Sequence, residues 1–98
     1  MKPYIVIVHK DDNSAYGMTF PDAPGCFSAA DEIDELFAMA SEALEGWTET
    51  MIEFGNLLPA TRDLSEIKAD PEWAESFADA VLVIALAPPH PDKMKQAA

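Results

Sequence analysis

Basic residues are scarce in this chain of 98 residues. Six lysines and arginines stand against eighteen aspartates and glutamates, so the formal net charge at pH 7 is −12. A surface with this balance repels phosphate backbones, which argues against direct nucleic-acid binding by this chain and favours a partner with a cationic surface.

Cysteine and long apolar runs are also nearly absent. Because Cys26 is the single cysteine, no disulfide can form within the chain, and the N-terminal residues lack the apolar core and cleavage site of a signal peptide. The longest apolar stretch, residues 80–89, has about half of the ~20 residues that a membrane-spanning helix needs. We therefore expect a cytoplasmic protein without a membrane segment.

The length suits one domain with a modest hydrophobic core. We expect the domain to span residues 1–87, and residues 88–98, which begin with Pro-Pro-His-Pro-Asp, to form a flexible tail. β-Branched residues at 4–8 and alternating bulky and small residues at 15–20 predict a β-hairpin. A short third strand is predicted over residues 26–29 and completes an antiparallel meander.

A rigid turn joins the second and third predicted strands. Pro21 and Pro24 fix φ at about −65°. Asp22 can hydrogen-bond within the turn, and Gly25 can adopt a positive φ. Cys26 has no base or cation near it in the sequence, so we interpret it as a small buried residue that closes the turn, against the alternative of a nucleophile.

One long amphipathic helix is predicted to follow. Asp31 is a suitable N-cap, and Gly55-Asn56 should end the helix. Apolar residues at intervals of three and four predict the face that packs on the sheet: Ile33, Leu36, Phe37, Ala40, Leu44, Trp47, Met51 and Phe54.

A short helix and a last strand complete the predicted domain. Asp70 and Pro71 suit the N-cap and first position of the helix. Residues 80–86 are apolar on both faces, as expected of a strand in the middle of a sheet. The order β-β-β-α-(short α)-β predicts an α+β fold with one long helix packed on one face of the sheet. Apolar residues on the other face then require a partner.

The second strand, the turn and the helix start together form a larger motif. Its residues are Tyr16-Gly17-Met18-Thr19-Phe20-Pro21-Asp22-Ala23-Pro24-Gly25-Cys26, then Ser28-Ala29-Ala30-Asp31, then Glu35, Ala40, Glu42, Ala43 and Leu44. This motif resembles the HicB family, the antitoxins of bacterial HicA–HicB toxin–antitoxin systems, and the resemblance extends from Met1 to about Leu86. A Pro-Ser pair that is usual after the helix in that family is absent here.

The resemblance implies a partial, degraded ribonuclease-H-like domain without catalytic activity. It further implies a cognate HicA-like toxin, small, basic and RNA-cleaving, which the domain neutralises by masking its active surface. Members of the family often continue into a helix-turn-helix or ribbon-helix-helix module that binds operator DNA. Residues 88–98 are too short for either module, so we expect no DNA binding by this chain.

A metal-dependent nuclease is the enzymatic alternative. It needs a carboxylate near the centre of the first strand, and residues 4–8 contain none. Asp11, Asp12 and Asp22 belong to turns, where solvation or local hydrogen bonding explains them. We expect no catalytic residue, no metal site and no cofactor.

Two further interpretations complete the sequence analysis. His9 and His90 have no Cys, His or Asp at ligand spacing, so we expect surface histidines. A stand-alone oligomeric HicB-like scaffold, or a small-ligand binder without a toxin, remains the non-enzymatic alternative.

The predicted binding mechanism combines charge with apolar contact. Asp11, Asp12, Glu32 and Glu35 are the candidates for steering the toxin. The uncovered sheet face predicts a homo-oligomer, a dimer or larger.

Overall fold

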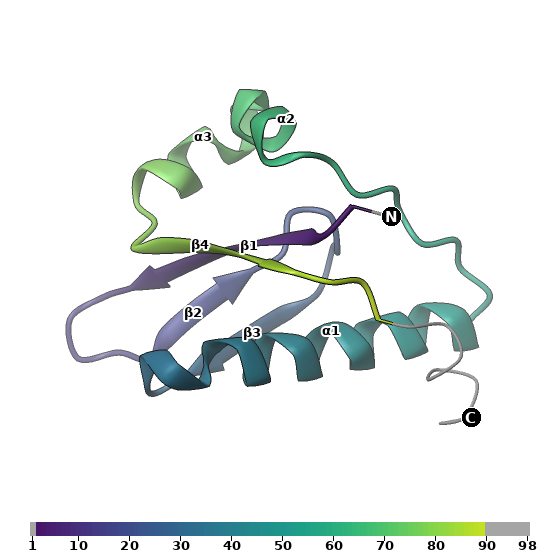
Figure 1. The fold of residues 1–98 in the computed structure, drawn as a ribbon, viewed down its shortest axis with the longest axis horizontal. Coiled ribbons are helices and arrows are strands. Elements are labelled where there is room, and N and C mark those ends of the chain that lie inside the picture. The colour runs from purple at the N-terminus through teal and green to yellow at the C-terminus, as the bar shows by residue number, and fades with distance from the viewer. Residues whose placement is uncertain (1, 90–98) are drawn as a thin grey trace.

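Four antiparallel strands form the centre of the structure, a computed structural model that describes residues 2–89 (Figure 1). They are β1 (Tyr4–Lys10), β2 (Tyr16–Thr19), β3 (Phe27–Ala30) and β4 (Leu82–Leu86), in the order β3-β2-β1-β4. The predicted α+β class and the three-strand meander are confirmed. The predicted tail falls mainly on residues 90–98, which lie outside the described part of the chain.

The long helix begins later than predicted. Glu32, not Asp31, is the N-cap of a 3₁₀ turn that comes before the long helix. The Glu32 backbone N–H donates to Glu35 Oε1 at 3.1 Å. This bond closes the short 3₁₀ helix η1 (Ile33–Glu35), and α1 (Leu36–Glu53) follows. Glu35 is in turn the N-cap of the long helix. The acidic side chain three residues after the N-cap therefore sets the helix start.

The end of α1 agrees with the prediction. Gly55 adopts a φ of 72°, a left-handed value that suits glycine. Its N–H donates to the Ile52 carbonyl at 3.0 Å, and the Asn56 N–H donates to the Met51 carbonyl at 2.9 Å. These bonds satisfy carbonyls at the helix end.

Only part of the predicted apolar face of α1 is buried. The buried residues lie four apart and are Leu36, Ala40, Leu44 and Thr48. Ile33, Phe37 and Phe54 are exposed, so their assignment to the core was wrong. Ile33 precedes α1 and Phe54 follows it, while Phe37 lies about 100° around the helix from Leu36.

Two short helices, where the sequence predicted one, lie on the opposite side of the sheet from α1 (Figure 1). They are α2 (Leu64–Ala69) and α3 (Pro71–Ala78). Asp70 caps α3 as predicted, since its Oδ1 accepts the Glu72 N–H at 3.0 Å. Ile67 of α2 is fully buried, as is Ile7 of β1. The chain itself therefore covers part of the face that we expected a partner to cover.

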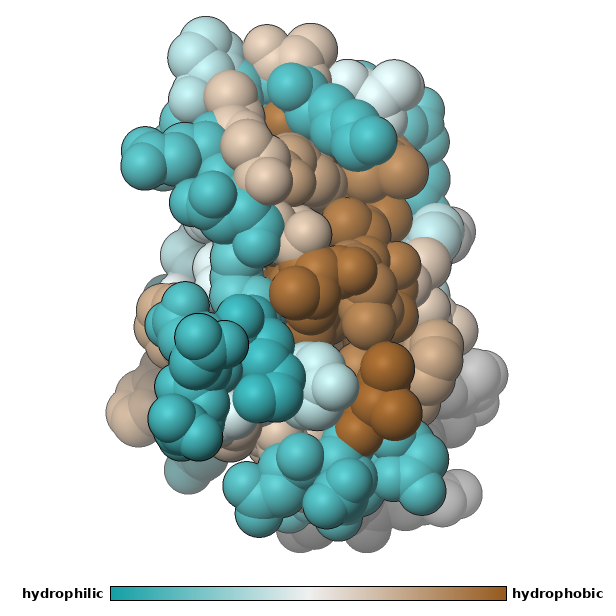
Figure 2. Space-filling model, turned by 90° about the vertical axis from the view of Figure 1, so that its left-hand side faces the viewer, coloured by the Kyte–Doolittle hydropathy of each residue, from teal (hydrophilic) through white to brown (hydrophobic). Residues whose placement is uncertain are grey.

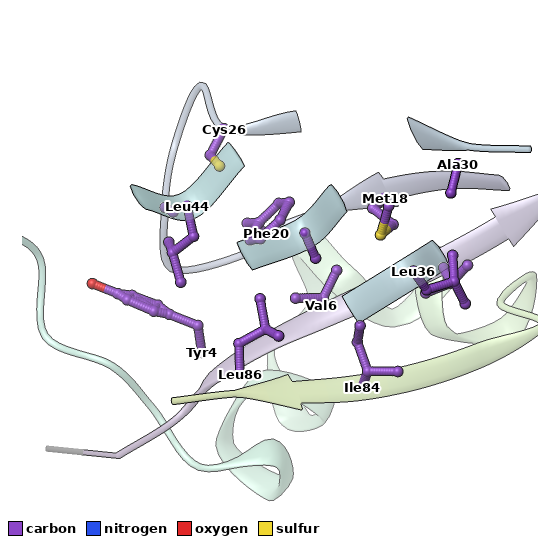
Figure 3. Close-up of a cluster of buried hydrophobic side chains, with 13 residues drawn as sticks. Tyr4, Val6, Met18, Phe20, Cys26, Ala30, Leu36, Leu44, Ile84 and Leu86 are labelled. Atoms are coloured by element: carbon purple, nitrogen blue, oxygen red, sulfur yellow. The ribbon is translucent and has the colours of Figure 1, made fainter. Parts of the chain in front are cut away.

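The main core lies between the sheet and α1. Figure 3 shows side chains from all four strands pointing toward the buried line of α1. Those from the strands include Tyr4, Val6, Met18, Ala30, Ile84 and Leu86, and Phe20 joins them from the position just after β2. The predicted bulky face of the second strand is thus confirmed in Met18 and Phe20, which are buried.

The position of β4 differs from the prediction. Among residues 2–89 it pairs with β1 alone, from Tyr4↔Leu86 to Val8↔Leu82, and it forms an edge of the sheet there. We predicted a central strand because both of its faces are apolar. On the side of β4 that faces α1, Ile84 and Leu86 are buried, whereas on the other side Val83 is half-buried and Ala85 is exposed.

A buried ion pair fastens the Pro/Gly turn to the segment before α2. The Asp22 side chain is only 5% exposed, and its Oδ1 lies 2.8 Å from both Arg62 Nε and Arg62 Nη2. Its Oδ2 accepts the Arg62 backbone N–H at 2.7 Å, and Arg62 Nη1 reaches Asp70 Oδ2 at 3.0 Å. Asp22 was expected to bond within its own turn, but its partner lies 40 residues later.

The rest of the turn is held by a positive φ and by hydrogen bonds to its backbone. Gly25 has a φ of 85°. The Cys26 N–H donates to the Ala23 carbonyl at 3.0 Å, and Trp47 Nε1 of α1 donates to the Pro24 carbonyl at 2.9 Å. Cys26 is buried, and this burial raises the pKa of its thiol to about 11. The thiol is therefore protonated at neutral pH, which does not suit a nucleophile.

The first prediction concerns the ion pair. Asp22→Asn should lower the free energy of unfolding by about 2–3 kcal/mol, because it leaves the Arg62 guanidinium without its buried partner, although Arg62 keeps some contact with solvent. Urea unfolding followed by circular dichroism measures the change. Asp12→Asn, at an exposed position, is the control and should shift stability by less than about 0.5 kcal/mol. Equal unfolding midpoints for the two variants would show that the ion pair does not stabilise the fold.

The second prediction concerns the thiol. Near neutral pH, an aromatic disulfide reagent should modify Cys26 in the folded protein at least about 100-fold more slowly than in denaturant, because the raised pKa leaves little thiolate and burial blocks access. Absorbance of the released thiolate gives both rates. Comparable rates would contradict the buried, structural assignment of Cys26 and support the nucleophile alternative.

Candidate functional site

Two acidic turns lie at the same end of the molecule. The register pairs Lys10 with Tyr16 and Tyr16 with Ala30, so the turn between β1 and β2 and the segment after β3 leave the sheet together. Figure 1 shows both at the end where α1 begins. We call residues 10–16 and 31–35 the acidic end.

The acidic end holds all four residues predicted to steer a partner. Asp11 and Asp12 lie in the first turn and Glu32 and Glu35 in the second, and all four are exposed. The structure thus brings together pairs that are about 20 residues apart in the sequence. Their part in binding stays a prediction.

Sequence reasoning left out two members of this acidic surface. Asp31 and Asp34 are exposed between the predicted residues. Asp31 was interpreted only as the helix N-cap, so its place on this surface was not considered, and Asp34 was not among the predicted residues. Six carboxylates against the one ammonium of Lys10 give the acidic end a formal charge of −5.

Few of the carboxylates at the acidic end are engaged by other groups of the protein. Lys10 Nζ donates to the Ser14 carbonyl at 2.8 Å and to the Asp11 carbonyl at 3.3 Å, so it binds backbone and not carboxylates. Within residues 2–89, no ion pair engages Asp11 or Asp12. Glu35 differs because its Oε1 accepts the Glu32 N–H. Its carboxylate therefore has a structural role as well.

An apolar patch adjoins the acidic end. Its residues are Ile33, Phe37, Val81 and Leu82. The first three are 59%, 58% and 52% exposed, and Leu82 is half-buried. Figure 2, which views the molecule from this end, shows apolar side chains gathered beside hydrophilic groups. An apolar area with a charged border is the usual composition of a protein–protein contact surface.

Phe37 faces the β4 side of α1. Met39, Ala43 and Gly46 line a groove beside β3, on one side of the buried line through Leu36. Phe37 lies on the other side of that line, because successive helical residues are rotated by about 100°. The Val81 N–H donates to the Val8 carbonyl at 2.8 Å, which holds Val81 beside the end of β1. These positions explain the continuity of the patch between α1 and β4.

The groove between β3 and α1 has a volume of about 500 Å³ and is mainly apolar. Its polar groups are used within the protein, since Ser28 Oγ donates to the Met39 carbonyl at 3.0 Å and Trp47 Nε1 to the Pro24 carbonyl. Glu42 is the charged residue on its wall.

His9 differs from its prediction as a surface residue. The side chain is half-buried, and Nε2 lies 2.9 Å from the Ser76 carbonyl of α3. Since a carbonyl can only accept, Nε2 carries the hydrogen. His90 lies outside the described residues.

Two kinds of feature are absent from the described residues, 2–89. No group of three or more His, Cys, Asp and Glu side chains there is placed to hold a metal ion. In that part of the chain, no helix is long and apolar enough to cross a membrane.

Comparison with known proteins agrees with this geometry. The antitoxin HicB of Burkholderia pseudomallei is similar in structure, with a TM-score of 0.71 and 35% identity over 89% of this chain and 63% of that one. A chain of the HicA3 and HicB3 toxin–antitoxin complex has the same fold, with a TM-score of 0.71 and 22% identity over 90% of this chain and 99% of that one.

A protein of Haemophilus phage HP1, of 14.9 kDa and uncharacterized, is 33% identical over 69 residues, which are 70% of this chain and 52% of that protein. The chain thus spans about half of the phage relative and less than two thirds of the Burkholderia antitoxin. A family described as the HicB-like antitoxin of bacterial toxin–antitoxin systems matches residues 4–96. Because the match covers nearly the whole sequence, the chain belongs to the HicB-like antitoxin family.

Proposed function

We propose that this protein is a cytoplasmic antitoxin that binds a small, basic, RNA-cleaving toxin of the HicA type and masks its active surface. Membership of the HicB-like family supports the antitoxin role. The acidic end carries the proposal further, because it joins a formal charge of −5 to exposed apolar side chains on one surface. A basic protein is the partner that such a surface attracts.

Charge and apolar contact have separate tasks in this proposal. Carboxylates of the acidic end attract the toxin over distances comparable to the Debye length, about 8 Å at physiological salt, and so raise the association rate. Ile33, exposed in the middle of the acidic segment 31–35, then provides apolar contact. Burying such a side chain at the centre of an interface contributes more affinity than charges at its rim.

The proposed action is binding without catalysis. The Cys26 thiol is buried and protonated at neutral pH. The carboxylate of Asp22, close to it in sequence, is bound by Arg62. The acids of the acidic end lie on turns and not on β1, where a ribonuclease-H-type metal site needs one.

The third prediction tests the function itself. Co-expression with a cognate HicA-like toxin should relieve the growth arrest that the toxin causes alone, and the two proteins should elute together in gel filtration. Persistent growth arrest without a complex would refute the proposal and favour the stand-alone scaffold. An Asp22→Asn variant connects this activity to folding. If the variant fails in both assays only under conditions in which it is unfolded, the folded domain is what neutralises the toxin.

The fourth prediction tests the acidic end. The triple variant Asp11→Asn, Asp12→Asn, Glu32→Gln should slow association with the toxin on the order of 10-fold at low salt, because charge steering is weakened. Glu35 is spared because it bonds to Glu32. Stopped-flow fluorescence at several salt concentrations measures the association rates.

The matched control removes the same charge elsewhere: Glu49→Gln, Glu53→Gln and Glu75→Gln, all at exposed positions. It should change the association rate by less than about 3-fold. Raising the salt from about 0.05 to 0.5 M should slow the unmodified protein and remove the difference between the variants. An equal effect of both triple variants would mean that net charge acts without a local site.

A further inference from the structure

β3 is an edge strand with a groove beside it. Among residues 2–89 it pairs with β2 alone, and Figure 1 shows it at the edge of the sheet next to α1. An edge strand presents unpaired N–H and C=O groups, which proteins usually protect with a charge, a proline or a bulge. β3 has the sequence Phe-Ser-Ala-Ala and carries neither a charge nor a proline. Its backbone can therefore pair with an added strand.

The side chains along β3 alternate between two faces. Ser28 and Ala30 point toward α1, since Ser28 Oγ donates to the Met39 carbonyl at 3.0 Å and Ala30 belongs to the main core. Phe27 and Ala29 therefore point to the opposite face, where Phe27 is 69% exposed. A strand added to this edge would cover Phe27 on one face and fill the groove on the other.

Gly46 lies on the wall of the groove, in the middle of α1. Glycine at such a position lowers the stability of a helix relative to alanine. Neither the backbone nor the packing of the chain requires it here. Its φ is not positive, and a Cβ at this position would have no atom within 4 Å apart from its chain neighbours and the backbone of its own helix. Glycine therefore keeps this part of the groove open for a group from outside the chain.

Glu42 supplies the charge of the groove. It is exposed, and within residues 2–89 no ion pair engages it. The other residues that line the groove are uncharged. Because the chain as a whole carries −12, a basic side chain is the complement of this wall, whereas a second copy would bring its own negative charge.

We propose that the groove binds a short extended segment of another protein, which adds to β3 as a strand and places a lysine or arginine beside Glu42 and an apolar side chain against Gly46. These two positions are one helical turn apart, about 6 Å. Alternate side chains of a strand lie about 6.6 Å apart, so two residues separated by one fit both positions. In strand addition of this kind, backbone hydrogen bonds give affinity and alternate side chains give specificity.

The direction of α1 sets the order of the two side chains. Ser28 contacts the Met39 carbonyl, and the earlier Pro24 contacts the later Trp47, so α1 runs antiparallel to β3. A strand added antiparallel to β3, the commoner arrangement, runs in the direction of α1 and meets Glu42 before it meets position 46. The recognised sequence is a basic residue, an intervening residue and an apolar residue. The intervening residue points to the face of Phe27 and is apolar as well.

The size of the groove separates this partner from the toxin. A volume of about 500 Å³ beside a strand of four residues holds only a short segment. A stable protein–protein interface uses about 20–30 residues of each partner, and masking a toxin needs a contact of that size. None of the residues that line the groove belongs to the acidic end. We therefore assign the segment to a protein other than the toxin.

The test uses a synthetic peptide with blocked ends, Ser-Lys-Val-Leu-Thr-Ser, and protein labelled with ¹⁵N. Titration should shift the amide signals of residues 27–30, and the outward amides of β3 should exchange more slowly with solvent when the peptide is bound. Glutamate in place of the lysine of the peptide should weaken binding at least about 10-fold. Proline in place of the valine should weaken binding to a similar extent, because it cannot complete the strand pairing.

Variants of the protein locate the site. Gly46→Leu should abolish peptide binding, because its side chain fills the open part of the groove. Ser41→Leu, at an exposed position about 140° around α1 from Gly46, is the control and should bind normally. Glu42→Lys should weaken binding at least about 10-fold, whereas Glu75→Lys, the same charge change at an exposed position of α3, should change it less than about 3-fold. Circular dichroism and urea unfolding check that each variant is folded.

Four results would overturn the proposal. The first is the absence of shifts at millimolar peptide. The second is binding that neither Gly46→Leu nor Glu42→Lys affects, which would place the peptide elsewhere. The third is protection of the outward β3 amides in the protein alone that grows with its concentration, which would assign the edge to a second copy.

The fourth result is loss of peptide binding when a cognate toxin is bound, which would assign the groove to the toxin interface. That outcome would leave the proposed antitoxin function intact. A failure to bind toxin would in turn leave the peptide titration unchanged, so the two proposals can fail independently.

Discussion

The contact between Asp22 and Arg62 is the interaction on which the arrangement of layers depends. Asp22 lies in the turn between β2 and β3, and Arg62 lies just before α2. Their bonds, extended by Arg62 to Asp70 at the start of α3, tie the meander to the two helices on the far side of the sheet. Because α1 reaches the same turn through Trp47 and the Pro24 carbonyl, helices from both layers are positioned against one short loop. A loop with such constraints is suited to fixing surfaces in place and not to moving during a reaction.

The surface divides its charge and its apolar area between different parts of the fold. Carboxylates concentrate where two turns leave the sheet, while the β4 edge carries none. Electrostatic attraction acts at long range and depends on salt, whereas apolar contact acts only after desolvation. The charged and the apolar surface are therefore suited to different stages of an association, the encounter and then the close contact.

Local signals predicted much of the fold, and non-local contacts account for the errors. Gly55 and Asp70 were assigned correctly because a helix end or cap depends on a few adjacent residues. α2 was missed because its six residues are too few to show a period. Asp22 was given a partner in its own turn, since no sequence pattern connects it to Arg62 across 40 residues. The acids of the candidate site were found, but their common location required the strand register. The edge position of β4 cannot be read from composition, because composition reports the total burial of a strand and not whether one chain or two provide it.

The pairing of β4 with β1 has a consequence for synthesis. Of the four described strands, β1 is synthesised first and is central in the sheet, yet one of its two neighbours comes from residues 82–86. Until those residues emerge, β1 has an unpaired side with several of the most apolar residues of the protein, and closing so long a loop is slow compared with forming the hairpin. An incomplete chain therefore remains a target for proteases and chaperones. Completion of the sheet is therefore coupled to translation through β4.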